Sequence, residues 1–235
     1  MMPMTSEFYI RNIANVVHSW MSYIYEVSDT KHFAAESSLR YPIAGLLERK
    51  KSVNLFMEDG HPMFNNARVD FKWEEKGEIV YLELKHVRDV SINVQEIFDD
   101  IFRLAFINDA KAHKYFLLCG ESTIFEKRIR QRTIIEEQAT TQDTGKVKIK
   151  QSGGDVKYLF DNYFSFETNE MNQIGTKVCE FNCENTYYNT FKDTYSPKCK
   201  VGMEIPSKIK VRTNLMQPID KGLRSAVAIW KVEMI

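Results

Sequence analysis

The chain has few cysteines and no long apolar stretch. Its 235 residues include 4 cysteines, too few for a disulfide framework at this length. No window of 18 residues is apolar throughout, so no membrane-spanning helix is expected. Near the amino terminus, Glu7 and Arg11 stand where a secretory signal would place a basic segment and an apolar run. These features predict a reduced, cytoplasmic protein.

The chain also lacks net charge. Lys and Arg together number 32, as do Asp and Glu, so the formal charge is zero. A neutral balance argues against a strongly basic protein that passively coats nucleic acid. It does not exclude an enzyme that acts on nucleic acid, because acidic metal ligands offset the basic groups that contact phosphate. With 43% hydrophobic residues the chain is too apolar to be disordered, and its length suits one domain.

The first half alternates helix and strand patterns. Apolar spacing predicts amphipathic helices over residues 7–27 and 33–50, and Pro42 indicates a kink or a later start in the second. Residues 51–66 contain turn-forming Gly, Pro and Asn and are expected to form loop and turn. Residues 67–73 and 78–85 are predicted strands, and the short Gly-containing link between them is typical of a hairpin.

A strongly amphipathic helix is predicted after the hairpin. Asn93 and Glu96 are spaced as a capping box before an apolar-periodic run over residues 94–106. A short apolar strand at 114–119 and a helix at 121–138 are expected next.

The remaining chain is polar and rich in Asn and Thr. Residues 139–207 are expected to form short strands and loops, followed by closing strands at 209–215 and 226–232. We therefore predict one mixed α/β domain, with a helical segment at 1–50, a catalytic core at 51–138 and a β-rich elaboration at 139–235.

Charged residues on the predicted hairpin point to chemistry. Strand side chains alternate between faces, so Glu83 and Lys85 share one face, about 7 Å apart, while Leu82 and Leu84 take the other. Asp70 lies on the partner strand, where its side chain can reach Glu83. Two converging carboxylates suit Mg²⁺, which prefers oxygen ligands and keeps several waters. A nearby lysine can hold an attacking water or stabilise charge on a phosphate. Alone, however, Glu-x-Lys is most often a cross-strand salt bridge on a solvated surface.

The order of the predicted elements adds weight to this motif. Helix, Asp70 strand, Glu83-Leu84-Lys85 strand, amphipathic helix and apolar strand form an α-β-β-α-β order that resembles the PD-(D/E)XK, restriction-endonuclease-like superfamily of nucleases. The resemblance covers roughly residues 33–120, and Val69 replaces the family's usual proline. It implies a restriction-endonuclease-like mixed sheet flanked by helices. It also implies an enzyme that hydrolyses phosphodiester bonds with Mg²⁺, for which Mn²⁺ can substitute.

The resemblance further suggests substrate and assembly. DNA is the expected substrate, with RNA as the alternative, and the biological setting would be restriction, repair or defence. Asp70 and Glu83 would bind the metal and Lys85 would position water. Many such enzymes work as dimers, so a homodimer is expected. The alternative is a nuclease-like fold that binds nucleic acid or protein without cleaving it.

That superfamily commonly adds an acid from the preceding helix. Glu36 opens the predicted helix and Glu48 closes it, and they are too far apart for both to reach one metal. We favour Glu36, because its neighbours Ala35 and Ser37 are small, whereas Glu48 lies in a charged segment. The other interpretation of Glu36 is a favourable first-turn charge.

Residues on the amphipathic helix are further candidates. Gln95, near its start, either touches the site in a supporting role or is a solvated first-turn residue. Arg103 either pairs with an acid near the site or extends its charge to solvent. His86 follows Lys85 but should face away from it, so it is not expected to be a catalytic base.

Two other clusters have simpler interpretations. Lys127, Arg128, Arg130 and Arg132 could follow a phosphate backbone, or form a solvated helix face. A second cluster consists of Cys179, Cys183 and Cys199. Zinc is disfavoured there, because structural sites usually need four ligands and no histidine follows His113.

Overall fold

A computed structural model describes residues 6–27, 35–87, 93–130, 160–165, 175–217 and 224–235. Within these residues, one open mixed sheet of seven strands has the order β1-β2-β3-β4-β7-β6-β5. Its strands are β1 (Asn54–Gly60), β2 (Arg68–Glu75), β3 (Glu78–Val87), β4 (Ala112–Glu121), β5 (Thr176–Asn182), β6 (Lys208–Gln217) and β7 (Ser225–Met234). Strands β3 and β4 are parallel, and the other neighbouring pairs are antiparallel.

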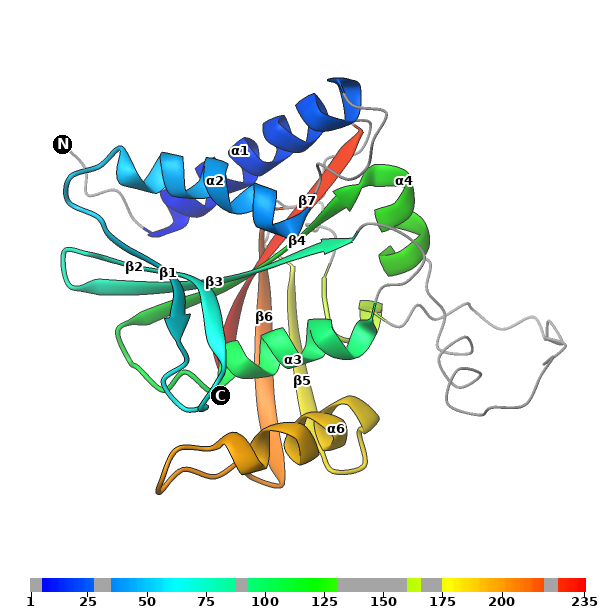
Figure 1. Cartoon of the computed structure of the whole chain (residues 1–235). Helices are drawn as coiled ribbons and strands as arrows, with labels where there is room; N and C mark the ends of the chain where they lie inside the picture. Colours follow the sequence, from blue (N-terminus) through cyan, green and yellow to red (C-terminus); the bar gives the residue numbers. More distant parts are fainter. Residues whose placement is uncertain (1–5, 28–34, 88–92, 131–159, 166–174, 218–223) are drawn as a thin grey trace, which may run out of the picture.

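Helices cover both faces of the sheet (Figure 1). Helices α1 (Ser6–Val27) and α2 (Glu36–Glu48) pack on one face, and α3 (Val94–Ala105) and α6 (Thr186–Tyr195) pack on the other. Short helical segments complete the described chain: α4 (Ser122–Phe125), η2 (Glu126–Arg130), η3 (Phe160–Asn162) and η4 (Ser196–Lys198). No helix of the described residues is long and apolar enough to cross a membrane.

Strand β3 is buried on both faces. Leu82 and Leu84 belong to the core under α1 and α2, whereas Tyr81 and Val87 belong to the core under α3. The predicted alternation is therefore confirmed, and the face that carries Glu83 is the one that α3 covers. This burial places a charged side chain against the interior of the protein.

The predicted hairpin of β2 and β3 is confirmed. Glu75 pairs with Glu78, and Lys76 and Gly77 between them have φ values of 53° and 85°. Two consecutive positive φ values are what a tight two-residue hairpin turn requires. This register fixes how β2 lies against β3, and hence where Asp70 lies relative to Glu83.

The helical predictions for the first half hold, but one loop prediction is wrong. Helices α1 and α2 match the predicted segments, and α2 continues through Pro42. The cap of α3 is confirmed, because the Asn93 side chain accepts a hydrogen bond from Gln95 N at 3.1 Å. Residues 51–66, however, contain strand β1. Among the described strands it pairs with β2 alone, at the edge of the sheet. It is largely exposed, so it lacks the apolar alternation of a buried strand.

The described residues of the second half contain both strands and a helix. The closing strands β6 and β7 are confirmed, but residues 139–207 also contain helix α6, which was not predicted. Its buried side chains, Tyr188, Phe191 and Tyr195, follow helical spacing within a polar sequence of low apolar content. Of the helix predicted at 121–138, the described part is α4 and η2, and residues 131–138 lie outside the described chain.

Candidate active site

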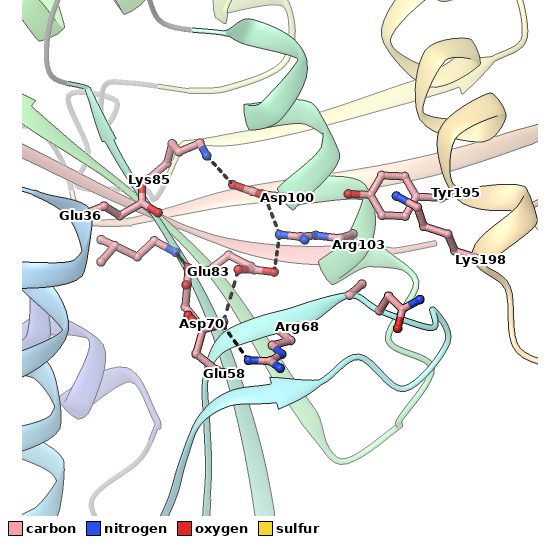
Figure 2. A pocket seen from close by; sticks show the side chains of 13 residues that line it. Glu36, Glu58, Arg68, Asp70, Glu83, Lys85, Asp100, Arg103, Tyr195 and Lys198 are labelled. Atoms are coloured by element: carbon pink, nitrogen blue, oxygen red, sulfur yellow. Dashed lines mark hydrogen bonds and ion pairs between the residues drawn. The ribbon is translucent and has the colours of Figure 1, made fainter.

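One pocket collects the charged residues of the predicted site. It has a volume of about 330 Å³ and is lined by residues from both halves of the chain. Figure 2 shows its side chains, which come from α2, the β1–β2 hairpin, β3, α3, α6 and η4. The lining residues are Glu36, Glu58, Asn66, Ala67, Arg68, Asp70, Glu83, Leu84, Lys85, Asp100, Arg103, Tyr195 and Lys198.

Asp70 and Glu83 meet where β2 separates from β3. The backbone pairing of β2 with β3 ends at Phe71 and Leu82. Beyond it, Asp70 N donates to Glu83 Oε2 at 3.4 Å, and Leu84 N donates to Asp70 Oδ2 at 2.8 Å. Side-chain oxygens thus replace backbone acceptors at this fork, which holds the two carboxylates side by side in the pocket.

Glu36 reaches the same edge of β3 from the start of α2. Its Oε2 accepts a hydrogen bond from His86 N at 3.2 Å. Since the amides of alternate residues point the same way, the carboxylates of Asp70 and Glu36 take neighbouring positions along β3. Burial raises the pKa of Glu36, although nearby Lys85 opposes this shift. Glu48 lies at the other end of α2, is exposed and does not line the pocket.

Lys85 lies among acidic groups. Its Nζ is 3.0 Å from a Glu96 carboxylate oxygen and 3.8 Å from one of Asp100. Burial alone would lower the pKa of Lys85, but Asp100, Glu36 and Glu96 outweigh it and raise the pKa. The side chain is therefore an ammonium ion at neutral pH, with its charge at one end of the pocket.

Arg103 is the central cation of the pocket. One of its terminal nitrogens lies 2.9 Å from Glu83 Oε1 and 2.6 Å from Asp100 Oδ1. The Glu83 side chain is only 2% exposed, and burial raises its pKa well above the usual range despite Arg103. Burial likewise raises the pKa of Asp100 to about 7. These two acids are crowded and hold protons more tightly than ordinary carboxylates, which is typical of functional sites.

Arg40 is a second cation of the site. It forms ion pairs with Asp70 and with Glu58. It lies on α2 one turn after Glu36, so the two side chains share a helix face. This spacing is the signal that could have linked Arg40 to the site.

The second half of the chain forms the far wall. Tyr195 comes from α6 and Lys198 from η4 (Figure 2). Burial raises the pKa of Tyr195, and the nearby Arg103 guanidinium opposes this shift. The sequence could not link either residue to Asp70, because their place in the pocket depends on how α6 and η4 pack against α3.

The other residues of the pocket differ in how clearly the sequence indicates them. Asp100 and Arg103 interrupt the apolar face of α3, and polar residues at buried helical positions usually have partners. Asp100 was not predicted, whereas the pairing of Arg103 with an acid near the site was one of its two interpretations. Glu58 lies in β1, where the sequence predicts a loop, and Arg68 begins β2, where the sequence predicts a strand but no role for Arg68.

Several predicted residues lie away from the pocket. Gln95 donates to Asp99 Oδ1 at 2.7 Å and to Tyr187 O at 3.0 Å, and so links α3 to α6. His86 faces away, as predicted, with its Nε2 3.2 Å from the Tyr25 hydroxyl. Lys127 is exposed and does not line the pocket. The side chains of Arg128, Arg130 and Arg132 lie outside the described residues.

The cysteines form no cluster. All four are free thiols. The thiols of Cys179, Cys183 and Cys199 donate to three different carbonyl oxygens, those of Asn162, Ser207 and Tyr195.

The donor chemistry of the pocket fits a hard divalent cation. Asp70 and Glu83 offer only oxygen ligands, and a carboxylate oxygen that accepts one hydrogen bond keeps a further lone pair. Among the described residues, no group of three or more His, Cys, Asp or Glu side chains is arranged to hold a metal ion. A cation here would therefore take two protein carboxylates and complete its shell with water and substrate oxygens, as Mg²⁺ commonly does.

A search of protein-family models and of curated proteins finds no match to the sequence, and no solved structure matches the fold. The site is therefore interpreted from its own geometry and chemistry.

Proposed function

We propose that this protein is a Mg²⁺-dependent nuclease that hydrolyses phosphodiester bonds in DNA. One observation carries the proposal: residues from α2, β2 and β3, namely Glu36, Asp70, Glu83 and Lys85, line one pocket. The described order α2-β1-β2-β3-α3-β4 contains the α-β-β-α-β order of the resemblance, with β1 added. A restriction-endonuclease-like core is part of this proposal.

Each side chain has a role that its surroundings support. Asp70 and Glu83 would hold the metal ion, which supplies Lewis-acid activation of the scissile phosphate when bound. The Lys85 ammonium holds the attacking water and stabilises charge that develops on the phosphate oxygens. The raised pKa of Glu36 makes its carboxylate a better proton acceptor than that of an exposed glutamate. The Glu36 carboxylate also lies close enough to Lys85 for the two charges to interact.

Arg103 and Arg40 position the carboxylates. Arg103 takes one oxygen of Glu83, and Arg40 takes one oxygen of Asp70. With these oxygens held, the other oxygen of each carboxylate is fixed in the fork between β2 and β3. A site built this way is pre-organised before substrate arrives.

The same ion pairs support a second candidate function. Because Asp70 and Glu83 already have arginine partners, the pocket can be neutral enough to bind a nucleic-acid phosphate without metal or cleavage. In that case the fold would be a binding module.

A substrate panel separates the two functions. The protein is incubated with circular and linear DNA, single- and double-stranded, and with RNA, in Mg²⁺ and in EDTA. A nuclease cuts at least one DNA in Mg²⁺ only, and Asp70→Asn abolishes the cut. Binding of DNA in EDTA with no cleavage of any substrate supports the binding module.

A further inference from the structure

The far wall of the pocket carries a cation that pairs with no carboxylate of the described residues. Lys198 lies in η4 and is half-buried at the pocket. Arg40, Lys85 and Arg103 each pair with carboxylates, but among the described residues no carboxylate oxygen lies within 4.0 Å of Lys198 Nζ. Asp99 is influenced by its charge without forming such a pair. Lys198 therefore differs from the other three cations in forming no ion pair with a described carboxylate.

The backbone around Lys198 is fixed to the loop that leads into β2. Asn65 N donates to Lys198 O at 2.7 Å, and Lys200 N donates to Met63 O at 2.9 Å. Phe64 and Cys199 form an antiparallel bridge between these bonds. The loop therefore connects Lys198 through a short stretch of backbone to Asp70. The fold therefore fixes the backbone of Lys198 relative to the strand that carries Asp70.

The neighbouring aromatic ring is not available to stack on a base. Tyr195 is only 9% exposed. Its ring stacks on Phe191 with centroids 4.6 Å apart, and Lys198 Nζ lies 4.4 Å from its centroid. The ring is therefore covered by Phe191 and by the Lys198 ammonium. Single-stranded nucleic-acid sites commonly stack bases on open aromatic faces, and the described residues of this wall offer none.

We propose that Lys198 forms an anion subsite for a second phosphate of a DNA strand whose scissile phosphate lies at Lys85. The subsite rests on the proposed function. Lys85 and Lys198 lie at opposite ends of the pocket, with Arg103 between them (Figure 2). The substrate is thus a polynucleotide held through its backbone, and this wall contacts phosphate without selecting a base.

The test compares K198A with K192A, a matched control. Lys192 lies on neighbouring α6, is near Cys183 and does not line the pocket. Two substrates are used: a single-stranded DNA oligonucleotide and bis(p-nitrophenyl) phosphate, which has one phosphodiester. In K198A the ratio of kcat/KM for the oligonucleotide to that for the small diester should fall severalfold. K192A should keep the wild-type ratio, and K198R should restore most of it.

Binding without cleavage provides the second measurement. Fluorescence anisotropy of the oligonucleotide in EDTA gives the slope of log K against log salt. Loss of one phosphate contact reduces this slope by about 0.7 for a single strand. A slope in K198A equal to that of K192A overturns the subsite, even if the wild type is a nuclease. A reduced slope with no hydrolysis of either substrate by the wild type overturns the nuclease and keeps the subsite. Tighter binding of an RNA oligonucleotide overturns the assignment to DNA.

Discussion

Replacing Arg103, the central cation of the pocket, should show how much this residue contributes to the stability of the folded protein. Arg103→Met keeps an unbranched side chain but leaves Glu83 and Asp100 without the guanidinium that pairs with both. Breaking a buried ion pair by removing one partner costs roughly 3–5 kcal/mol. The Arg103 side chain is 16% exposed, so we take the lower end, about 3 kcal/mol at pH 8. For a chain of this size that corresponds to a fall in Tm of about 6–12 °C.

The pH dependence of this loss is the sharper test. Both acids already have raised pKa values, and the charge of Arg103 opposes that rise. Without Arg103 they should take up protons at pH 6 and lose much of their repulsion, so the loss of stability should be smaller there than at pH 8. Thermal unfolding in EDTA at both pH values measures it. The control is Arg212→Met, whose pair with Glu233 is more exposed (side chains 40% and 29% exposed) and should cost less than about 1 kcal/mol. A Tm of Arg103→Met at pH 8 equal to that of the control would refute the reasoning.

Three further outcomes are expected. Mg²⁺ should raise the Tm of the wild type but not that of Asp70→Asn, and a metal response that survives in the variant would place the ion elsewhere. In the folded state Asp100 keeps its proton up to about pH 7, whereas in the unfolded state it loses the proton near pH 4. This group therefore makes the free energy of unfolding fall as the pH rises from about 4 to about 7. In Asp100→Asn that part of the slope should disappear from urea unfolding curves, and an unchanged slope would contradict the raised pKa. Glu36→Gln should slow DNA cleavage at least tenfold, whereas Glu48→Gln should cleave at the wild-type rate; the reverse result would exchange their roles.

The parts of the site that sequence predicted are those governed by local periodicity. Strand alternation placed Glu83 and Lys85 on one face of β3, and the hairpin turn placed Asp70 beside them. The preference for Glu36 over Glu48 is matched by its position in the pocket. The roles of these residues in catalysis stay predictions.

The parts that sequence missed depend on contacts between distant segments. Strand β1 is an exposed edge and has no burial pattern to reveal it. Helix α6 is held by its aromatic contacts with α3, for example Phe191 against Phe102, and these exist only in the folded protein. The same fold-back brings Tyr195 and Lys198 to the pocket. Local sequence patterns therefore located the charged residues of the pocket but not the wall that faces them.

The most direct measurement of the central claim is the single-turnover cleavage rate of DNA in Mg²⁺ by wild type and by Lys85→Ala. Loss of one pre-organised charge at the reacting phosphate typically slows the reaction on the order of 10²-fold or more, roughly 3 kcal/mol. DNA affinity should fall far less, because one phosphate contact among several supplies a fraction of binding. We predict a variant that is folded and binds DNA but is nearly inactive in cleavage. Equal cleavage rates for variant and wild type would contradict the assignment of this pocket as the active site.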